Sequence, residues 1–343
     1  MTQDFVISIP KRLTLISGIY DLKLPQKEIP SKRKCVLDFS ECEFGEPLPL
    51  LLLGLHFHEL KRRNPDVEFV CRSRNSDFRG YADHIGFFKY LGFNRGNPTN
   101  HAAGSRNYTP ITLFNIKQLR SDAAEGPVGE LVDKEASKLA EIVTQKNDGA
   151  LFDVIQYSFR EILRNAVEHS QGSVAVVFGQ YWPYHRKAEI VIYDNGVGIF
   201  ETLLDNEYVE FSSNSEALKS ALLPGISGVG REERAQQDDR WGNSGFGLFV
   251  TSRLCSEAGL FRMISGNSTI SLKCGVQTET NWSFDGTCVQ LIIDTGSIGS
   301  KVDRIREIVE EGEDSRKELM DDFPIKASVA SKFLSRDFEK VAV

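Results

Sequence analysis

Residues 160–169 have the sequence REILRNAVEH, in which apolar and polar positions recur with the period of an α-helix. Ile162 and Ala166 belong to the apolar stripe, whereas Glu161 and Asn165, four residues apart, share another face of the same helix. A carboxylate and a carboxamide side by side can bind a metal ion and orient a water molecule. The same pair also suits a solvated helix face, so this helix needs support from elsewhere in the chain.

A second informative stretch is DNGVGI at residues 194–199, which directly follows a predicted buried strand over residues 188–193. Gly196 and Gly198 permit a close approach between the backbone and a ligand. The Asp194 carboxylate can accept a hydrogen bond from the exocyclic amine of a base. Taken alone, Asp-Asn-Gly is also an ordinary hairpin turn.

A third stretch, GNSGFGL at residues 242–248, leads into a predicted helix over residues 247–258. The free N–H groups and the positive dipole end of such a helix can receive phosphates, and Gly245 and Gly247 keep the turn open. Later in the chain, Thr287 begins an apolar strand and offers a hydroxyl to the same pocket. The order and spacing of these segments predict one nucleotide pocket.

These residues resemble the motifs of the GHKL superfamily, the ATP-binding domain shared by DNA gyrase, histidine kinases, mismatch-repair MutL and the large heat-shock chaperone. The resemblance covers about residues 128–294 and implies ATP and Mg²⁺ as ligands. It implies the following roles: Glu161 as catalytic base, Asn165 as Mg²⁺ ligand, Asp194, Gly196 and Gly198 around adenine, Gly245 and Gly247 at the phosphates, and Thr287 after the closing glycine. Asn243 departs from the pattern, because a further glycine is common at that position.

The spacing of Glu161, Asn165 and His169 is similar to that of the anti-sigma-factor serine kinases within this superfamily. His169 either braces the phosphate side of the pocket or packs near the helix end. We expect a slow ATPase that acts as a conformational switch in bacterial-type regulation. A protein kinase acting on a serine or histidine of a partner, and a non-catalytic adaptor that nucleotide stabilises, stay open as alternatives. An orthodox histidine kinase is disfavoured, because residues 108–168 contain no histidine.

The fold expected for residues 111–299 is an α/β sandwich with helices on one face of a mixed sheet. Helical composition or periodicity predicts the helices, and apolar β-rich runs predict the strands. The expected helices span residues 128–146, 150–169 and 247–258, and the expected strands span residues 174–179, 188–193, 260–264, 269–273 and 287–294. The forty residues between Phe200 and Trp241 have little regular pattern, which favours a mobile lid.

Residues 1–110 are expected to form a smaller α/β domain that ends in a linker. The patterns predict strands over residues 35–39 and 66–71 and helices over residues 48–63 and 81–91. The unit is similar to STAS domains, the fold of the antagonists that such kinases regulate. Those antagonists place a phosphorylatable serine where this chain has Glu46, so a phosphorylation switch is not expected here.

Residues 300–343 form a charged tail that favours a helix over residues 304–320, with no obvious core face. This tail can dock, form a homodimer or stay solvated, and a protein partner is expected at the tail or at the STAS-like domain. The net charge of −7 argues against nucleic acid as a partner. Six scattered cysteines predict reduced, buried thiols, and the absence of a signal peptide and of a long apolar run predicts a cytoplasmic protein without a membrane span.

Overall fold

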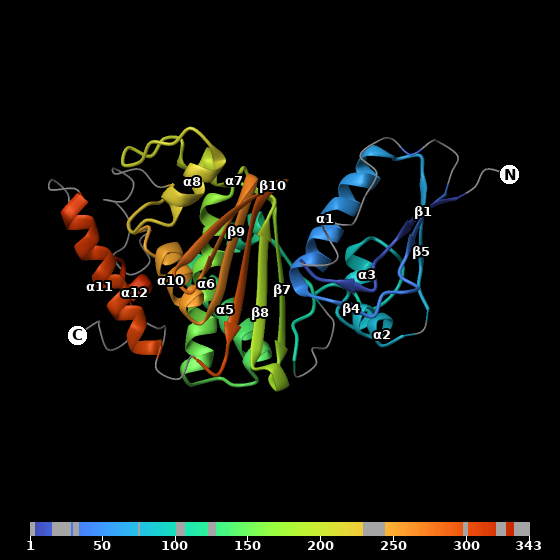
Figure 1. Cartoon of the computed structure of the whole chain (residues 1–343), viewed down its shortest axis with the longest axis horizontal. Coiled ribbons are helices and arrows are strands. Elements are labelled where there is room, and N and C mark those ends of the chain that lie inside the picture. The colour runs from blue at the N-terminus through green and yellow to red at the C-terminus, as the bar shows by residue number, and fades with distance from the viewer. Residues whose placement is uncertain are drawn as a thin grey trace. The chain divides into compact units, whose positions relative to one another are not determined.

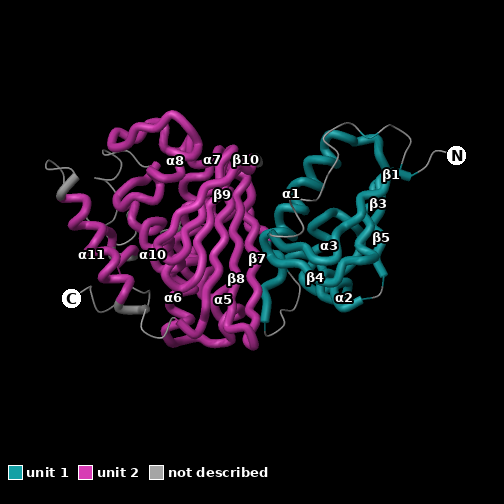
Figure 2. The backbone as a smooth tube through the Cα atoms, in the orientation of Figure 1, with its two compact units in different colours: residues 1–112 teal, residues 113–343 magenta. Residues whose placement is uncertain are grey.

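The computed structural model in Figure 1 describes residues 4–15, 29, 34–74, 76–100, 107–122, 128–228, 244–297, 301–319 and 327–332. The chain divides into two compact units, residues 1–112 and residues 113–343 (Figure 2). The linker expected over residues 94–110 includes residues 101–106, which lie outside the described residues.

The first unit is built on a parallel three-stranded sheet in the order β1-β3-β5. Phe5 of β1 pairs with Cys35 of β3, which in turn pairs with Phe69 of β5. The strands are β1 (Phe5–Ser8), β3 (Lys34–Asp38) and β5 (Glu68–Arg72), with a second small sheet of β2 (Arg12–Leu13) and β4 (Phe44–Gly45), and the helices are α1 (Pro47–Arg63), α2 (Asp77–His84) and α3 (Phe87–Tyr90). The first strand, β1, was not predicted.

Helix α1 occurs where the sequence predicts it, whereas the single helix expected over residues 81–91 is wrong. Two short helices, α2 and α3, replace it because Gly86 between them has a left-handed backbone, with φ of 79°. Proline at the start of α1 and the basic residues Lys61 to Arg63 in its last turn suit the two ends of a helix. The phenyl ring of Phe39, just after β3, packs edge-on against Phe87 and Phe88.

The second unit contains a five-stranded sheet in the order β6-β7-β8-β10-β9. The strands are β6 (Thr112–Asn115), β7 (Val174–Trp182), β8 (Lys187–Asp194), β9 (Gly259–Lys273) and β10 (Val276–Asp294). The pairs β7-β8, β8-β10 and β10-β9 are antiparallel, so the mixed sheet that we expected is not found in them.

Tight connections explain this antiparallel arrangement. Cys274 and Gly275, with φ of 48° and 78°, form the two-residue turn between β9 and β10, and such a turn joins only antiparallel strands. A short 3-10 helix, η2 (Pro183–His185), similarly returns the chain from β7 into β8. The two strands expected over residues 260–264 and 269–273 are one continuous strand.

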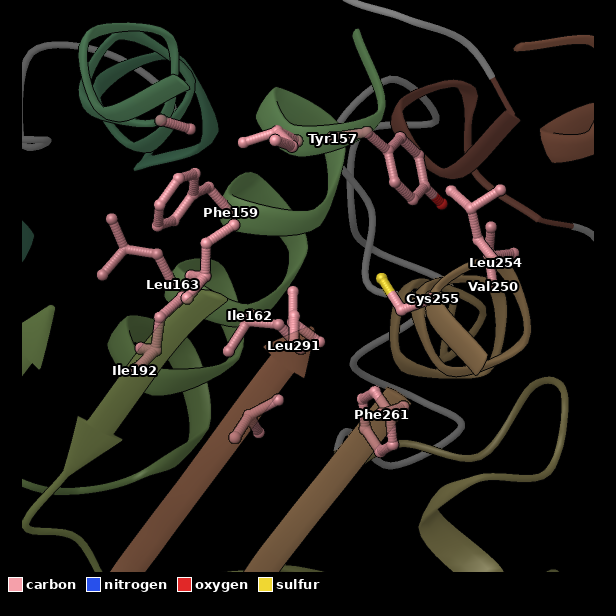
Figure 3. Close-up of a cluster of buried hydrophobic side chains, with 14 of the residues drawn as sticks. Tyr157, Phe159, Ile162, Leu163, Ile192, Val250, Leu254, Cys255, Phe261 and Leu291 are labelled. Carbon is pink, nitrogen blue, oxygen red and sulfur yellow. The ribbon is translucent and has the colours of Figure 1, made fainter. Parts of the chain in front are cut away.

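The helices of the second unit pack against this sheet or against one another. They are α4 (Ile116–Asp122), α5 (Val128–Thr144), α6 (Ala150–His169), α7 (Gly198–Leu203), α8 (Asn214–Ala221), α10 (Gly247–Glu257), α11 (Lys301–Leu319) and α12 (Val329–Lys332). Alternate residues of the strands, such as Ile192 and Leu291, share one apolar core with Leu163 of α6 and Leu254 of α10 (Figure 3). Helix α6 is buried along most of its length and therefore fixes the position of its polar residues.

The segment expected as an irregular lid contains regular structure. Helix α8 lies between Phe200 and Trp241, and α7 extends into the start of the same segment. The prediction of an irregular segment is therefore wrong for its described part, which ends at Gly228. The side chain of Ser213 caps α8 by accepting a hydrogen bond from the backbone N–H of Glu216, at 3.2 Å. Residues 229–243, which include Asn243, lie outside the described residues.

The charged tail docks onto the second unit, which corrects the expectation that it has no core face. Ile305, Ile308 and Val309 of α11 are buried in the core shared by α6, α10 and the sheet. At Gly312 the helix approaches α10 so closely that a Cβ there would lie 2.7 Å from the ring of Phe249. The acidic residues in this segment obscured its apolar stripe in the sequence.

All six cysteines are free thiols, and Cys35, Cys42, Cys255 and Cys288 are buried as expected. Cys71 is only partly buried and Cys274, in the turn between β9 and β10, is exposed, which corrects the expectation for these two residues. Among the helices of the described residues, none combines the length and apolar composition needed to span a bilayer.

Candidate functional site

One pocket in the second unit collects side chains from all four segments singled out in the sequence. Its lining includes Glu161, Asn165 and His169 of α6, Asp194 at the end of β8, Gly198 at the start of α7, Gly245 and Gly247 around the start of α10, and Thr287 of β10. These residues come from positions spread over more than a hundred residues of sequence. The fold therefore brings together eight of the nine predicted site residues.

Glu161 is buried in the wall of this pocket and is only 4% exposed. The guanidinium of Arg160 donates from Nε to Glu161 Oε1 at 3.0 Å. Arg160 is itself fully buried, lies over the ring of Tyr157 and approaches the carboxylate of Asp133 at 3.6 Å. A solvated helix face is thus excluded for Glu161, because both its burial and its ion pair fix the carboxylate inside the unit.

The second oxygen of Glu161 lies against the glycine turn that precedes α10. A Cβ atom at Gly247 would overlap Glu161 Oε2, so only glycine fits between this carboxylate and the helix. The positive end of the α10 dipole at the same point favours a negatively charged neighbour. Glu161 therefore connects α6 with the glycine turn, with Oε1 held by Arg160 and Oε2 directed to the turn.

Asn165 and His169 follow Glu161 along α6 and line the same pocket. Asn165 is half-buried, and within the part of the chain that the structure describes its side chain has no hydrogen-bond partner. The imidazole of His169 lies with Nε2 at 3.9 Å from Glu168 Oε2. Asn165 thus presents an amide oxygen and nitrogen to the pocket, whereas His169 is engaged by its neighbours.

Asp194 ends β8 inside the pocket and is 7% exposed. Burial raises the pKa of its carboxyl to about 7, although the backbone N–H of Gly196, which donates to Oδ1 at 2.9 Å, acts in the opposite direction. The strand register places Asp194 opposite Ala175 of β7 and Thr287 of β10. A buried carboxyl at a strand end, held by one local hydrogen bond, is suited to recognising a donor on a ligand.

The two glycines after Asp194 have different structural tasks. Gly198 lines the pocket and has a left-handed backbone, with φ of 85°. Gly196 is not among the lining residues, and a Cβ there would overlap the carbonyl oxygen of Ser170 at the end of α6. The neighbouring N–H of Val197 donates to that carbonyl at 2.8 Å. Gly196 therefore allows the loop after Asp194 to pack against the end of α6.

Gly245 brings the glycine turn into contact with the segment that follows α8. Its φ is 75°, and a Cβ there would lie 2.6 Å from the carbonyl carbon of Gly225. The N–H of Gly225 donates to the carbonyl oxygen of Gly245 at 3.1 Å. Through this contact Ile226, Ser227 and Gly228 also enter the pocket lining.

Thr287 contributes a hydroxyl from β10. Its Oγ1 lies 3.3 Å from the hydroxyl of Ser265, which also accepts a hydrogen bond from the N–H of Ile199 at 3.0 Å. Gly286, just before it, has φ of 94° and approaches the carbonyl oxygen of Asp194 too closely for any Cβ. The glycine therefore allows β10 to place Thr287 directly opposite Asp194 in the strand register.

Several lining residues were not found from the sequence, among them Arg164, Thr202, Ser227 and Ser331. Arg164 lies on the same helix, one turn after Glu161, so helical spacing could have identified it. Ser331 carries no motif, because its approach depends on a C-terminal segment that folds back onto the unit. No group of three or more His, Cys, Asp or Glu side chains suited to a metal ion occurs within the described ranges.

Comparison of the chain with protein-family models and with curated proteins finds no match to either.

Proposed function

We propose that the second unit binds ATP with Mg²⁺ in this pocket and acts as a slow ATPase of the GHKL type, whose nucleotide state switches its conformation. The observation that carries this proposal is the meeting of four separate chain segments around one pocket with a buried aspartate at a strand end. The packing of helices α5, α6 and α10 on one sheet is compatible with the sandwich of that superfamily.

Asp194 is assigned to the adenine end of the pocket. Its carboxylate would accept a hydrogen bond from the exocyclic amine, and Gly198 lines the same pocket. A buried acceptor that loses its donor is costly, so such a site discriminates against bases without the amine. The hydroxyl of Thr287, level with Asp194 across the strands, supports a polar contact at the same end.

The turn before α10 is assigned to the phosphates. Helix α10 has eleven residues, so its first N–H groups and its dipole provide a positive end beside the pocket, whose lining includes Gly245 and Gly247. Asn165, whose carboxamide has no partner among the described residues, would hold Mg²⁺ through its oxygen. The bound ion would neutralise phosphate charge and keep most of its ligands as water and phosphate oxygens.

Glu161 is assigned to the water that attacks the terminal phosphate. Because Arg160 holds Oε1, the oxygen Oε2 at the glycine turn is the one that would orient this water and accept its proton. The first unit, with its parallel sheet flanked by helices, is proposed as a STAS-like module that docks a protein partner.

The proposal is tested by titrating Mg-ATP into the purified chain and following free phosphate. Asp194→Ala is expected to weaken ATP binding by at least about tenfold, because a buried hydrogen bond to a charged group is lost. Glu161→Ala is expected to keep ATP affinity and lose most of its turnover. Asp205→Ala, an exposed carboxylate beyond α7, serves as the control and is expected to leave both quantities unchanged.

Labelling at the γ-phosphate separates the proposed ATPase from a kinase. Free labelled phosphate supports the ATPase, whereas label that appears on a protein in the presence of cell extract, without release of phosphate, would show phosphoryl transfer to a partner. ATP affinity in Asp194→Ala equal to that of the wild type would refute the assignment of the pocket.

A further inference from the structure

The C-terminal segment 327–332 reaches the pocket that the earlier segments form. Ser331 of α12 belongs to the pocket lining and is only 2% exposed. It is 87 residues further along the chain than Ser244, the first described residue of the glycine turn, which also lines the pocket. A residue outside the four recognised segments therefore takes part in the site.

Independent contacts hold this segment in place. The Tyr157 hydroxyl of α6 donates to the backbone carbonyl of Ser331 at 3.0 Å; its oxygen is red in Figure 3. Glu313 of α11 accepts from the N–H of Ala327 at 2.9 Å and forms an ion pair with Lys332 at 2.8 Å. Because Tyr157 lies one helical turn before Glu161, the segment is tied to the helix that bears the proposed base.

The hydroxyl of Ser331 lies next to the proposed phosphate end. Its Oγ is 3.3 Å from Ser244 Oγ and 3.1 Å from Ser328 Oγ. Ser244 directly precedes Gly245, at the end of the pocket where α10 begins. Two serine hydroxyls from distant segments thus meet beside the positive end of a helix, and hydroxyl donors at such a point suit phosphate oxygens.

We propose that Ser331 binds the phosphates of the nucleotide together with Ser244, so that the C-terminal segment completes the nucleotide site. This inference rests on the proposed function. Each hydroxyl would turn its hydrogen from its serine neighbour to a phosphate oxygen. A hydrogen bond to a charged oxygen is stronger than one between two hydroxyls, so binding gains from the exchange.

Docking of the C-terminal segment and binding of the nucleotide are expected to affect each other equally. If docking of the segment strengthens nucleotide binding, then nucleotide must strengthen docking of the segment by the same factor. Mg-ATP is therefore expected to slow amide hydrogen exchange at residues 327–332, and adenosine, which lacks phosphates, is expected to slow it far less.

The decisive experiment measures the affinities of Mg-ATP and adenosine for the full chain and for Ser331→Ala. Loss of one hydrogen bond to phosphate is expected to weaken Mg-ATP binding by about tenfold and to leave adenosine binding unchanged. Ser315→Ala removes an exposed serine hydroxyl that donates to a carbonyl of its own helix, and it is the matched control. Loss of both affinities would indicate a structural defect and would overturn the assignment to phosphate.

Other outcomes are equally decisive. Unchanged ATP affinity in Ser331→Ala would refute a phosphate contact while leaving the proposed ATP site intact. Tighter ATP binding in that variant would show that the segment competes with the nucleotide, which is the opposite of the inference. A wild-type chain that binds neither ligand would overturn the proposed function and this inference together.

Discussion

At the scale of single residues, the site depends on ionisable groups that the fold buries. Burial raises the pKa of Asp194 to about 7, whereas an aspartate in an unfolded chain titrates near 3.9. At pH values between these two pKa values, Asp194 keeps its proton in the folded chain and has lost it in the unfolded chain. The free energy of unfolding therefore falls as pH rises from about 4 to about 7, because the unfolded state binds fewer protons there.

Replacing Asp194 by asparagine removes this titration while keeping the shape of the side chain. Asp194→Asn is expected to match the wild type near pH 4 and to exceed its free energy of unfolding by about 2 kcal/mol or more at pH 8. Urea unfolding followed by tryptophan fluorescence reports on the second unit, since Trp182, Trp241 and Trp282 all lie in it. Parallel pH profiles for the two proteins would contradict the prediction.

Arg316 of α11 is another buried ionisable group, and its Nε and Nη2 atoms have no hydrogen-bond partner in the part of the chain that the structure describes. Burial lowers the pKa of its guanidinium, which lies over the ring of Tyr208. Arg316→Met keeps the apolar length and is expected to raise the free energy of unfolding by about 1 to 3 kcal/mol. Lys317→Met, an exposed neighbour, is the control; an unstable Arg316→Met protein would show that the charge has a counter-ion.

At the scale of elements, glycines allow backbones to cross beside the pocket. Gly286 lets β10 pass the carbonyl oxygen of Asp194 on β8, and Gly245 lets the turn before α10 contact Gly225. Both have left-handed backbones, so they meet a conformational and a steric requirement at once. The pocket thus depends on close backbone contacts that any side chain larger than that of glycine would prevent.

Gly286→Ala is expected to separate β8 from β10 at the pocket and to lower the free energy of unfolding by about 3 kcal/mol or more. Gly275, in the turn between β9 and β10, has a similar φ of 78°, but apart from its chain neighbours no described residue has an atom within 4 Å of the point that a Cβ would occupy there. Gly275→Ala therefore measures the conformational cost alone, about 1 kcal/mol. Equal losses in the two variants would show that the clash with Asp194 is unimportant.

At the scale of the whole molecule, the second unit includes the C-terminal helix α11 in its core. Ile305, Ile308 and Val309 pack with α6, α10 and the sheet, and Glu313 then anchors the segment that carries Ser331. The tail is consequently part of the structure that supports the pocket. Any change that releases α11 is expected to affect the pocket as well as stability.

Ile308→Ala tests this role of α11. The side chain is fully buried, so its truncation is expected to cost about 2 to 5 kcal/mol of the free energy of unfolding. Glu310→Ala changes an exposed position of the same helix and is expected to stay within about 0.5 kcal/mol of the wild type. Tryptophan fluorescence during urea unfolding measures both; an Ile308→Ala protein as stable as the control would mean that α11 is dispensable.

Much of the local structure of the second unit could be predicted from the sequence. The helix over residues 150–169 has the predicted bounds, and the strand before Asp194 and the helix that begins at Gly247 lie within a residue or two of them. These features are local, because periodicity, glycines and strand-ending residues act over one or two turns of chain. The same local patterns also identified eight residues that line one pocket.

The sequence by itself therefore identified four of the segments that line the pocket and the elements in which they lie. Only the tertiary structure decided that Arg160 pairs with Glu161, that Gly196 packs on Ser170, and that the sheet pairs described above are antiparallel. It also decided that α11 is buried and that Ser331 enters the pocket. The physical reason is that each of these outcomes depends on close packing between residues distant in sequence, which local patterns do not encode.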